Sequence, residues 1–132
     1  MKKLLFLLVL NVLSIANVLA QEELSEFNLV EVMPEFLEYK GKVGEQALMS
    51  FLGENIHYPD SAAAQGVQGV VYVSFIIEKN GKVSSAKVLK GVNPYLDDEA
   101  LRVISDMPKW KPGKQKGKNV RVQFSLPIRF SL

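Results

Sequence analysis

The sequence predicts an α+β domain in which two helices pack on one face of a three-stranded antiparallel sheet. Residues 70–77 and 83–89 are rich in β-branched and aromatic side chains, and a short turn separates them. Residues 120–130 alternate between apolar and polar side chains, which is typical of a half-buried strand. Apolar residues recur at helical spacing before the first of these strands and again before the last.

Residues 1–20 have the layout of a secretory signal peptide. A basic start is followed by an apolar run over residues 4–10, and residues 18–20 are small enough for a cleavage site. The alternative is an uncleaved membrane anchor, which needs roughly 20 mainly apolar residues. Three polar residues interrupt the run: Asn11, Ser14 and Asn17. We therefore expect export with cleavage after Ala20, and a membrane-anchored protein if the leader is retained.

Charge and cysteine content narrow the class of protein. Removal of Lys2 and Lys3 from 16 basic residues leaves 14, which equals the number of acidic residues. The basic residues concentrate in the second half of the chain, but an exported protein rarely meets nucleic acid, so we expect solvated lysines and no nucleic-acid partner. The chain has no cysteine, which excludes disulfides, thiol chemistry and an acylated cysteine anchor.

Residues 21–45 are expected to form a weakly ordered acidic arm, and residues 46–132 to form the folded domain. The arm holds Gly41 and Gly44 and an isolated apolar segment around Met33. We expect it to contact the domain through Phe36 and Leu37.

Two helices are predicted at the start of the domain. The first runs from about residue 45 to residue 54, and its apolar residues recur at helical spacing: Ala47, Leu48, Phe51 and Leu52. Tyr58-Pro59 ends this region, since a residue before proline avoids the α conformation. A short second helix follows over residues 62–65, capped by Asp60 or Ser61 and closed by Gly66.

Residues 70–77 and 83–89 are predicted to form a hairpin. Asn80-Gly81 is a common two-residue type I′ turn, because both positions need a positive φ. This turn places Phe75 opposite Ala86 and Val73 opposite Val88. Both faces of the first strand are apolar, so it should be central in the sheet.

A longer helix is predicted after Pro94. Acidic residues 97–99 occupy its first turn, where carboxylates cap free amides. One apolar stripe is expected to face the core: Leu96, Ala100, Leu101, Ile104 and Met107. Pro108 ends this helix, and residues 110–113 are predicted to form a type II turn.

The final segment is predicted to be an edge strand, because Pro127 cannot donate a ladder hydrogen bond. Its even-numbered residues from 120 to 130 should face the core, while Arg121, Gln123, Ser125 and Arg129 face outward. An open edge can bind a visiting strand by β-augmentation. The proline and the arginines can equally serve to suppress such pairing, and composition leaves the two interpretations even.

Catalytic chemistry is not expected. His57 is the only histidine, and next to Tyr58-Pro59 it is best interpreted as a turn residue. The acidic residues 97–99 point in different directions on a helix, so they favour capping over metal binding. We therefore expect no enzyme activity, no metal and no cofactor.

The order of motifs resembles the C-terminal domain of TonB. The similar segments run from Tyr58-Pro59 through Gln68-Gly69 and the Asn80-Gly81-Lys82-Val83 turn, then through residues 96–101 and 108–113, and finally along the last strand. They cover residues 46–132. The segment from Met33 to Phe36 is similar to the lead-in of many exported relatives.

This resemblance implies a periplasmic protein of a Gram-negative cell that binds the TonB box, an extended segment of a TonB-dependent outer-membrane receptor, beside the final strand. It implies a role in energy-coupled transmembrane transport, with an inner-membrane motor complex as a further partner if the leader is retained. The implied partner-binding residues lie on residues 119–130 and near the Tyr-Pro pair: Asn55, Tyr58, Pro59, Asn119, Arg121, Gln123, Ser125 and Arg129.

Two other assignments remain open. The chain lacks the long proline-rich spacer of full-length TonB, so the alternative is a stand-alone periplasmic scaffold domain that binds another envelope protein without transducing energy. The open final edge can also pair with itself to form a homodimer.

Overall fold

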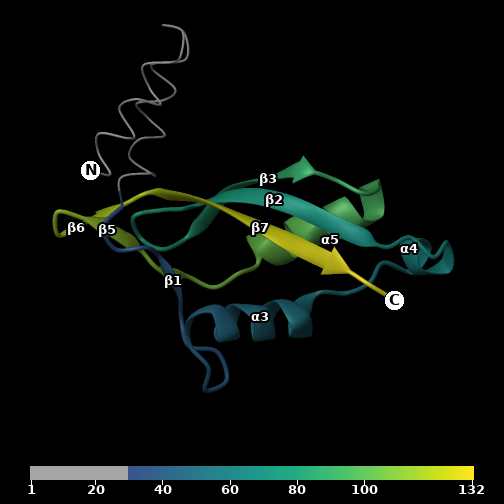
Figure 1. Cartoon of the computed structure of the whole chain (residues 1–132), viewed down its shortest axis with the longest axis horizontal. Helices are drawn as coiled ribbons and strands as arrows, with labels where there is room; N and C mark the ends of the chain where they lie inside the picture. Colours follow the sequence, from purple (N-terminus) through teal and green to yellow (C-terminus); the bar gives the residue numbers. More distant parts are fainter. Residues whose placement is uncertain (1–29) are drawn as a thin grey trace, which may run out of the picture.

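The computed structural model describes residues 30–132, so the predicted signal peptide and residues 21–29 of the predicted arm lie outside the described residues. Figure 1 shows the arrangement of the elements. In chain order they are β1 (Glu35–Phe36), α3 (Gly44–Asn55), α4 (Asp60–Ala64), β2 (Gly69–Ile77), β3 (Val83–Lys90), α5 (Pro94–Ser105), β4 (Trp110–Lys111), β5 (Gly113–Gln115), β6 (Lys118–Val120) and β7 (Val122–Phe130).

The predicted fold class is confirmed. The main sheet is antiparallel with strand order β3-β2-β7, so β2 is central as predicted and β7 lies at an edge. One face of β2 is fully buried through Val71, Val73, Phe75 and Ile77, because helices α3 and α5 contribute to the same apolar core. The described chain has the three predicted helical segments, α3, α4 and α5, and the short α4 adds Ala62 to the core that the two longer helices cover.

An aromatic cluster joins the N-terminal segment to the sheet. The ring of Phe36 lies 5.3 Å from Trp110 and 5.6 Å from Phe51, and Trp110 lies 5.3 Å from Phe124. Strand β1 pairs with β4 beside this cluster. Part of the segment expected to be weakly ordered therefore carries regular structure, and Phe36 is buried. Leu37 was expected to make the same contact, but it is 46% exposed.

The β2–β3 hairpin turns through three residues rather than two. The Glu78 N–H donates to the Lys82 carbonyl at 2.8 Å and closes the turn. The Glu78 carbonyl accepts from the Gly81 N–H. Gly81 has a φ of 86°, whereas Asn80 is not among the residues with positive φ. This geometry is a type I turn followed by a left-handed glycine, so the predicted type I′ turn is wrong.

The register of this hairpin is partly as predicted. Val73 pairs with Val88, but a register shift interrupts the ladder where Phe75 was expected to face Ala86. Ser85 has a φ of 52°, which is the left-handed geometry of an extra residue in a bulge. The three-residue turn shifts the pairing of β3 with β2 by one residue. The extra residue in the bulge reverses this shift, so Val88 pairs with Val73 as predicted.

Helix α5 buries a stripe that differs in one position from the prediction. Val103 is buried while Leu101 is only partly buried, and the other predicted stripe residues are buried. The side chain of Asn93 caps the helix by accepting from the Leu96 N–H, so the acidic residues 97–99 are not its N-cap. In α4 likewise, Pro59 occupies the N-cap, and neither Asp60 nor Ser61 caps by its side chain.

The predicted type II turn at residues 110–113 is wrong, because this stretch is extended and contains β4 and the start of β5. A β5–β6 hairpin follows that the sequence interpretation missed. Its two-residue loop has positive φ at both Lys116 and Gly117, as a type I′ turn requires. The last strand therefore starts at Val122, and Arg121 separates it from β6.

Candidate functional site

Strand β7 pairs with β2 on one side only. The ladder runs without a register shift from Gly69–Phe130 to Ile77–Val122. Among residues 30–132, no strand pairs with the other side of β7. This side is called the free edge of β7 below. In Figure 1, β7 is the yellow strand, and α3 lies below it in this view.

The position of Pro127 indicates which backbone groups reach the free edge. Hydrogen-bonded and non-hydrogen-bonded pairs alternate along an antiparallel ladder. Pro127 lies opposite Tyr72, and a proline inside a strand belongs where its nitrogen points away from the neighbouring strand. The same alternation turns the N–H groups of Gln123, Ser125 and Arg129 toward the free edge. The row of donors therefore has one gap, at the proline.

The side chains of β7 divide between two faces. Val122, Ile128 and Phe130 are buried in the core, while Phe124 and Leu126 on the same face are only partly buried. On the opposite face, the Gln123 amide donates to the Ser74 hydroxyl at 3.0 Å, and Ser74 is buried. The core face is therefore incompletely covered in the middle of the strand.

A groove runs along this incompletely covered stretch, between α3 and β7, and is called the α3–β7 groove below. One part has a volume of about 460 Å³ and the other about 350 Å³. Met49 and Pro127 line both parts, so the two parts adjoin one another. Apolar side chains form most of its walls: Leu48, Met49, Leu52 and Ile56 on the α3 side, and Phe124, Leu126, Pro127 and Ile128 on β7.

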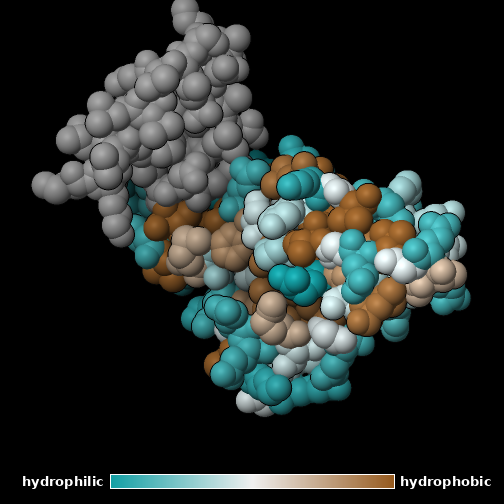
Figure 2. Space-filling view, turned by 45° about the vertical axis from the view of Figure 1, so that its right-hand side comes forward, coloured by the Kyte–Doolittle hydropathy of each residue, from teal (hydrophilic) through white to brown (hydrophobic). Residues whose placement is uncertain are grey.

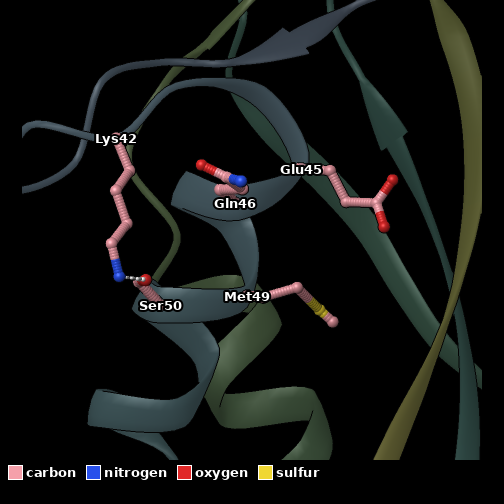
Figure 3. A pocket seen from close by; sticks show the side chains of 5 residues that line it. All are labelled: Lys42, Glu45, Gln46, Met49 and Ser50. Carbon is pink, nitrogen blue, oxygen red and sulfur yellow. Dashed lines mark hydrogen bonds between the residues drawn. The ribbon is translucent and has the colours of Figure 1, made fainter.

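The rim of the groove carries opposite charges at its two parts. Glu35 and Glu45 line the larger part, and Arg129 lines the smaller part. Within residues 30–132, the ion pairs include none of these three side chains. Figure 3 shows Glu45 and Met49 projecting from one side of α3, while Lys42 donates to Ser50 on another side at 3.0 Å.

Exposed apolar residues are also present away from the groove. Figure 2 shows hydrophobic surface in several patches between polar residues. Within residues 30–132, the large exposed hydrophobic side chains outside the groove include Met33, Tyr72, Leu89 and Tyr95. Exposure alone therefore does not distinguish Met49, whereas its place between two parts of one groove does.

Tyr58 packs against the end of β7, and the predicted site residues Asn55 and Pro59 are close to it in the sequence. The ring of Tyr58 stands at a right angle to Phe130, with centroids 5.7 Å apart, and its hydroxyl donates to the Val67 carbonyl. Pro59 follows as the N-cap of α4. Asn55 ends α3, and its amide donates to the Phe51 carbonyl at 2.8 Å.

A charged network fixes Asn55 against α5. Arg102 donates to the Asn55 carbonyl at 2.7 Å and to both oxygens of Glu99. Glu99 also accepts from the backbone N–H of His57 at 2.7 Å. Burial raises the pKa of Glu99, but the hydrogen bonds from Arg102 and His57 lower it by more, so this carboxyl group has a lowered pKa.

Asn119 and Arg121 lie at the opposite end of β7, beside the β2–β3 turn. The Asn119 amide donates to the Lys79 carbonyl at 3.1 Å, and Arg121 pairs with Glu78 at 2.9 Å. The Ser84 hydroxyl lowers the pKa of Glu78, and Arg121 adds to this effect against the opposing effect of burial. The eight predicted residues thus lie at both ends and along the middle of β7, and they do not form one compact cluster.

The sequence interpretation missed the residues of the groove itself. Met49 is an apolar position of the first predicted helix that the core stripe did not use, and Ile56 lies just after that helix. That surplus of apolar residues was the available signal. Trp110, which also lines the groove, was assigned to a turn, and its indole N–H is buried without a hydrogen-bond partner within residues 30–132.

Residues 30–132 contain no group of three histidine, aspartate or glutamate side chains placed to hold a metal ion. In the same part of the chain, no helix has the length and hydropathy needed to cross a membrane.

Comparison with known proteins places this geometry in context. A family model described as the Gram-negative bacterial TonB protein C-terminal matches residues 54–132. No curated protein matches the chain significantly. Two NMR solution structures of the Helicobacter pylori TonB C-terminal domain are similar to it. One has 27% identity and a TM-score of 0.50 over 65% of this chain and 90% of that one. The other has 29% identity and a TM-score of 0.51 over 71% and 88%.

Proposed function

The chain belongs to the family of Gram-negative bacterial TonB C-terminal domains, and from this premise we propose that it binds the TonB box of an outer-membrane receptor by strand addition along the free edge of β7. In this proposal the binding supports energy-coupled transport. The site is the outer side of β7, with Gln123, Ser125 and Arg129 as its central residues.

The observation that carries the proposal is the free edge of β7, which has one gap in its row of N–H donors, at Pro127. All nine residues of β7 pair with β2 without a register shift, while its other side has no strand partner within the described chain. Main-chain hydrogen bonds to such an edge supply affinity for an extended peptide of almost any sequence. Natural proteins usually block a long open edge, so one that persists indicates use.

The residues at the two ends of β7 extend the proposed contact. Tyr58, which Pro59 follows in sequence, contacts Phe130, where a visiting strand would leave the sheet. Asn55 uses its amide N–H within α3, so its carboxamide oxygen is the atom we assign to the partner. Asn119 and Arg121 border the other end. The proposed setting is the periplasm, which a cleaved leader would make available.

A peptide titration tests the proposal. TonB-box peptides are added to isotopically labelled full-length protein while backbone amide signals are followed by NMR. We expect shifts along residues 119–130 that are largest at Gln123, Ser125 and Arg129. Peptides N-methylated at successive positions should lose binding with a period of two, because only alternate amides face β7. An absence of shifts at millimolar peptide would refute the proposal.

Capture from envelope extracts separates this function from that of a stand-alone scaffold domain. Recovery of TonB-dependent receptors supports the transport role. Recovery of another envelope protein without any TonB-dependent receptor favours the scaffold domain. Sedimentation at several protein concentrations shows whether self-pairing of β7 into a homodimer competes with either.

A further inference from the structure

We propose that the α3–β7 groove selects the partner by its side chains: it takes an extended peptide with large apolar residues at alternate positions and a cationic residue beside Glu35 and Glu45. This inference rests on the proposed strand addition and adds the sequence class of the peptide. The argument combines the phase of the ladder, the shape of the groove and the charge at its rim.

The phase of the ladder determines which peptide side chains reach the groove. In a sheet, residues directly opposite one another point to the same face. Peptide residues opposite Phe124, Leu126 and Ile128 therefore point to the core face, toward α3. The intervening peptide residues, opposite Ser125 and Pro127, point to the outer face and to solvent. Every second side chain of the peptide is thus presented to the groove.

The groove has the size and lining that these side chains need. Its two parts, of about 460 and 350 Å³, are arranged along β7, and Met49 stands between them. Phe124 and Leu126 are only partly buried at the floor, so an incoming apolar side chain would complete their burial. Apolar contact area of this kind stabilises a complex in proportion to the area removed from water.

Charge at the rim adds a second selection. Two carboxylates, those of Glu35 and Glu45, line the larger part and have no ion pair within residues 30–132. Among residues 30–132, the charged side chain that lines the smaller part is that of Arg129. A peptide with a cationic residue at one end and a neutral or acidic residue at the other matches this polarity. The match also selects one direction of the peptide along β7.

The test uses a synthetic nine-residue peptide with leucine at two alternate central positions, threonine elsewhere and one terminal lysine. Both ends are capped to remove their charges. Full-length protein is titrated by NMR with this peptide and with variants in which the leucines become alanine or the lysine becomes glutamate. We expect the alanine variant to bind about tenfold more weakly or worse. The glutamate variant should bind about two- to fivefold more weakly at low salt.

Matched variants of the protein locate the contact. Met49→Lys places a charge between the two parts of the groove, whereas Met33→Lys makes the same change outside it. The two methionines are 53% and 55% exposed, so both variants should fold. We expect Met49→Lys to weaken the leucine peptide about tenfold and Met33→Lys to leave it unchanged. Glu45→Gln should reduce the preference for lysine, because Glu35 remains, and Glu38→Gln should leave it unchanged.

The outcomes distinguish this inference from the proposed function. If leucine and alanine peptides shift the β7 amides with equal affinity, strand addition stands and the selection by the groove is overturned. Equal weakening by Met49→Lys and Met33→Lys overturns it as well. If no peptide shifts the β7 amides, strand addition itself fails and the inference fails with it.

Discussion

Gly81 has a positive φ, and a Cβ placed there would lie 2.1 Å from the carbonyl oxygen of Trp110. Gly117 also has a positive φ, but a Cβ there would meet nothing within 4 Å. The two glycines therefore separate the cost of left-handed geometry from the cost of a backbone clash.

We expect Gly117→Ala to lower the free energy of unfolding by about 1–2 kcal/mol, the cost of a left-handed non-glycine residue. Gly81→Ala should cost a further ~1–3 kcal/mol, because the hairpin must move away from Trp110. Urea unfolding followed by circular dichroism measures both values. Equal midpoints for the two variants would show that the turn does not press against β4.

The carboxyl group of Glu99 links stability to pH. Its pKa lies below the ordinary value of 4.5, because Arg102 and the His57 N–H outweigh the effect of burial. A folded-state pKa below the unfolded one means that the unfolded chain binds more protons as the pH falls. The contribution of Glu99 is therefore present above the ordinary pKa and is lost as the pH falls through the folded-state pKa.

We expect Glu99→Gln to lower the free energy of unfolding at neutral pH and to reduce its further loss between about pH 5 and pH 2. The measurement is urea unfolding at several pH values. Glu38→Gln, which changes an exposed carboxylate outside this network, is the control. A variant with an acid dependence as steep as that of the wild type would contradict the role of Glu99.

At the scale of the element, Pro127 restrains the free edge of β7. It removes one donor from the row of outward-facing groups, so it limits pairing without preventing it. We expect Pro127→Ala to add one hydrogen bond to any strand that pairs there. That bond should tighten peptide binding about two- to tenfold.

Peptide titration measures the change in affinity, and sedimentation measures whether the same variant begins to self-associate. The free energy of unfolding is measured as well, because loss of the proline ring increases the conformational freedom of the unfolded chain. Unchanged affinity and unchanged association would mean that position 127 does not face the edge.

The elements differ in how far the sequence could predict them. The alternation along residues 122–130 identified β7 and its buried face, because a half-exposed strand has a period of two. The β5–β6 hairpin was not predicted, because its Lys116-Gly117 turn lacks the Asn-Gly pair that such turns commonly contain. The bulge at Ser85 depends on how β3 meets β2, which no local pattern records.

The candidate site likewise has one part that the local sequence predicts and one part that depends on tertiary packing. An open edge and its outward residues follow from local alternation and from Pro127. The α3–β7 groove depends on the distance between a helix and a strand that are far apart in the sequence. Residues such as Met49 could be identified only when tertiary packing placed the two elements beside each other.

At the scale of the whole molecule, the described fold extends beyond the segment that matches the family. That match begins at residue 54, yet β1 and most of α3 precede it. Phe36 joins this earlier part to the core through the rings of Phe51 and Trp110. The N-terminal part and the sheet should therefore unfold as one cooperative unit.

We expect Phe36→Ala to lower the free energy of unfolding by about 3–5 kcal/mol, as for other buried aromatic residues. Leu37→Ala, next in sequence but largely exposed, should change it by less than about 0.5 kcal/mol. Thermal and urea unfolding provide the measurements. Two separate transitions in the wild type would show that the part before residue 54 is an independent unit.

The unshifted ladder between β2 and β7 also has a mechanical consequence. Because every residue of β7 is paired with β2, a tensile load directed along β7 is shared by the whole row of cross-strand bonds at once. The β2–β3 pair, with its two register shifts, offers no such uniform row. A force along β7 therefore loads the β2–β7 hydrogen bonds in shear. A force perpendicular to β7 breaks these hydrogen bonds one after another. The same strand, β7, therefore has both the free edge and the longest unshifted ladder among the described residues.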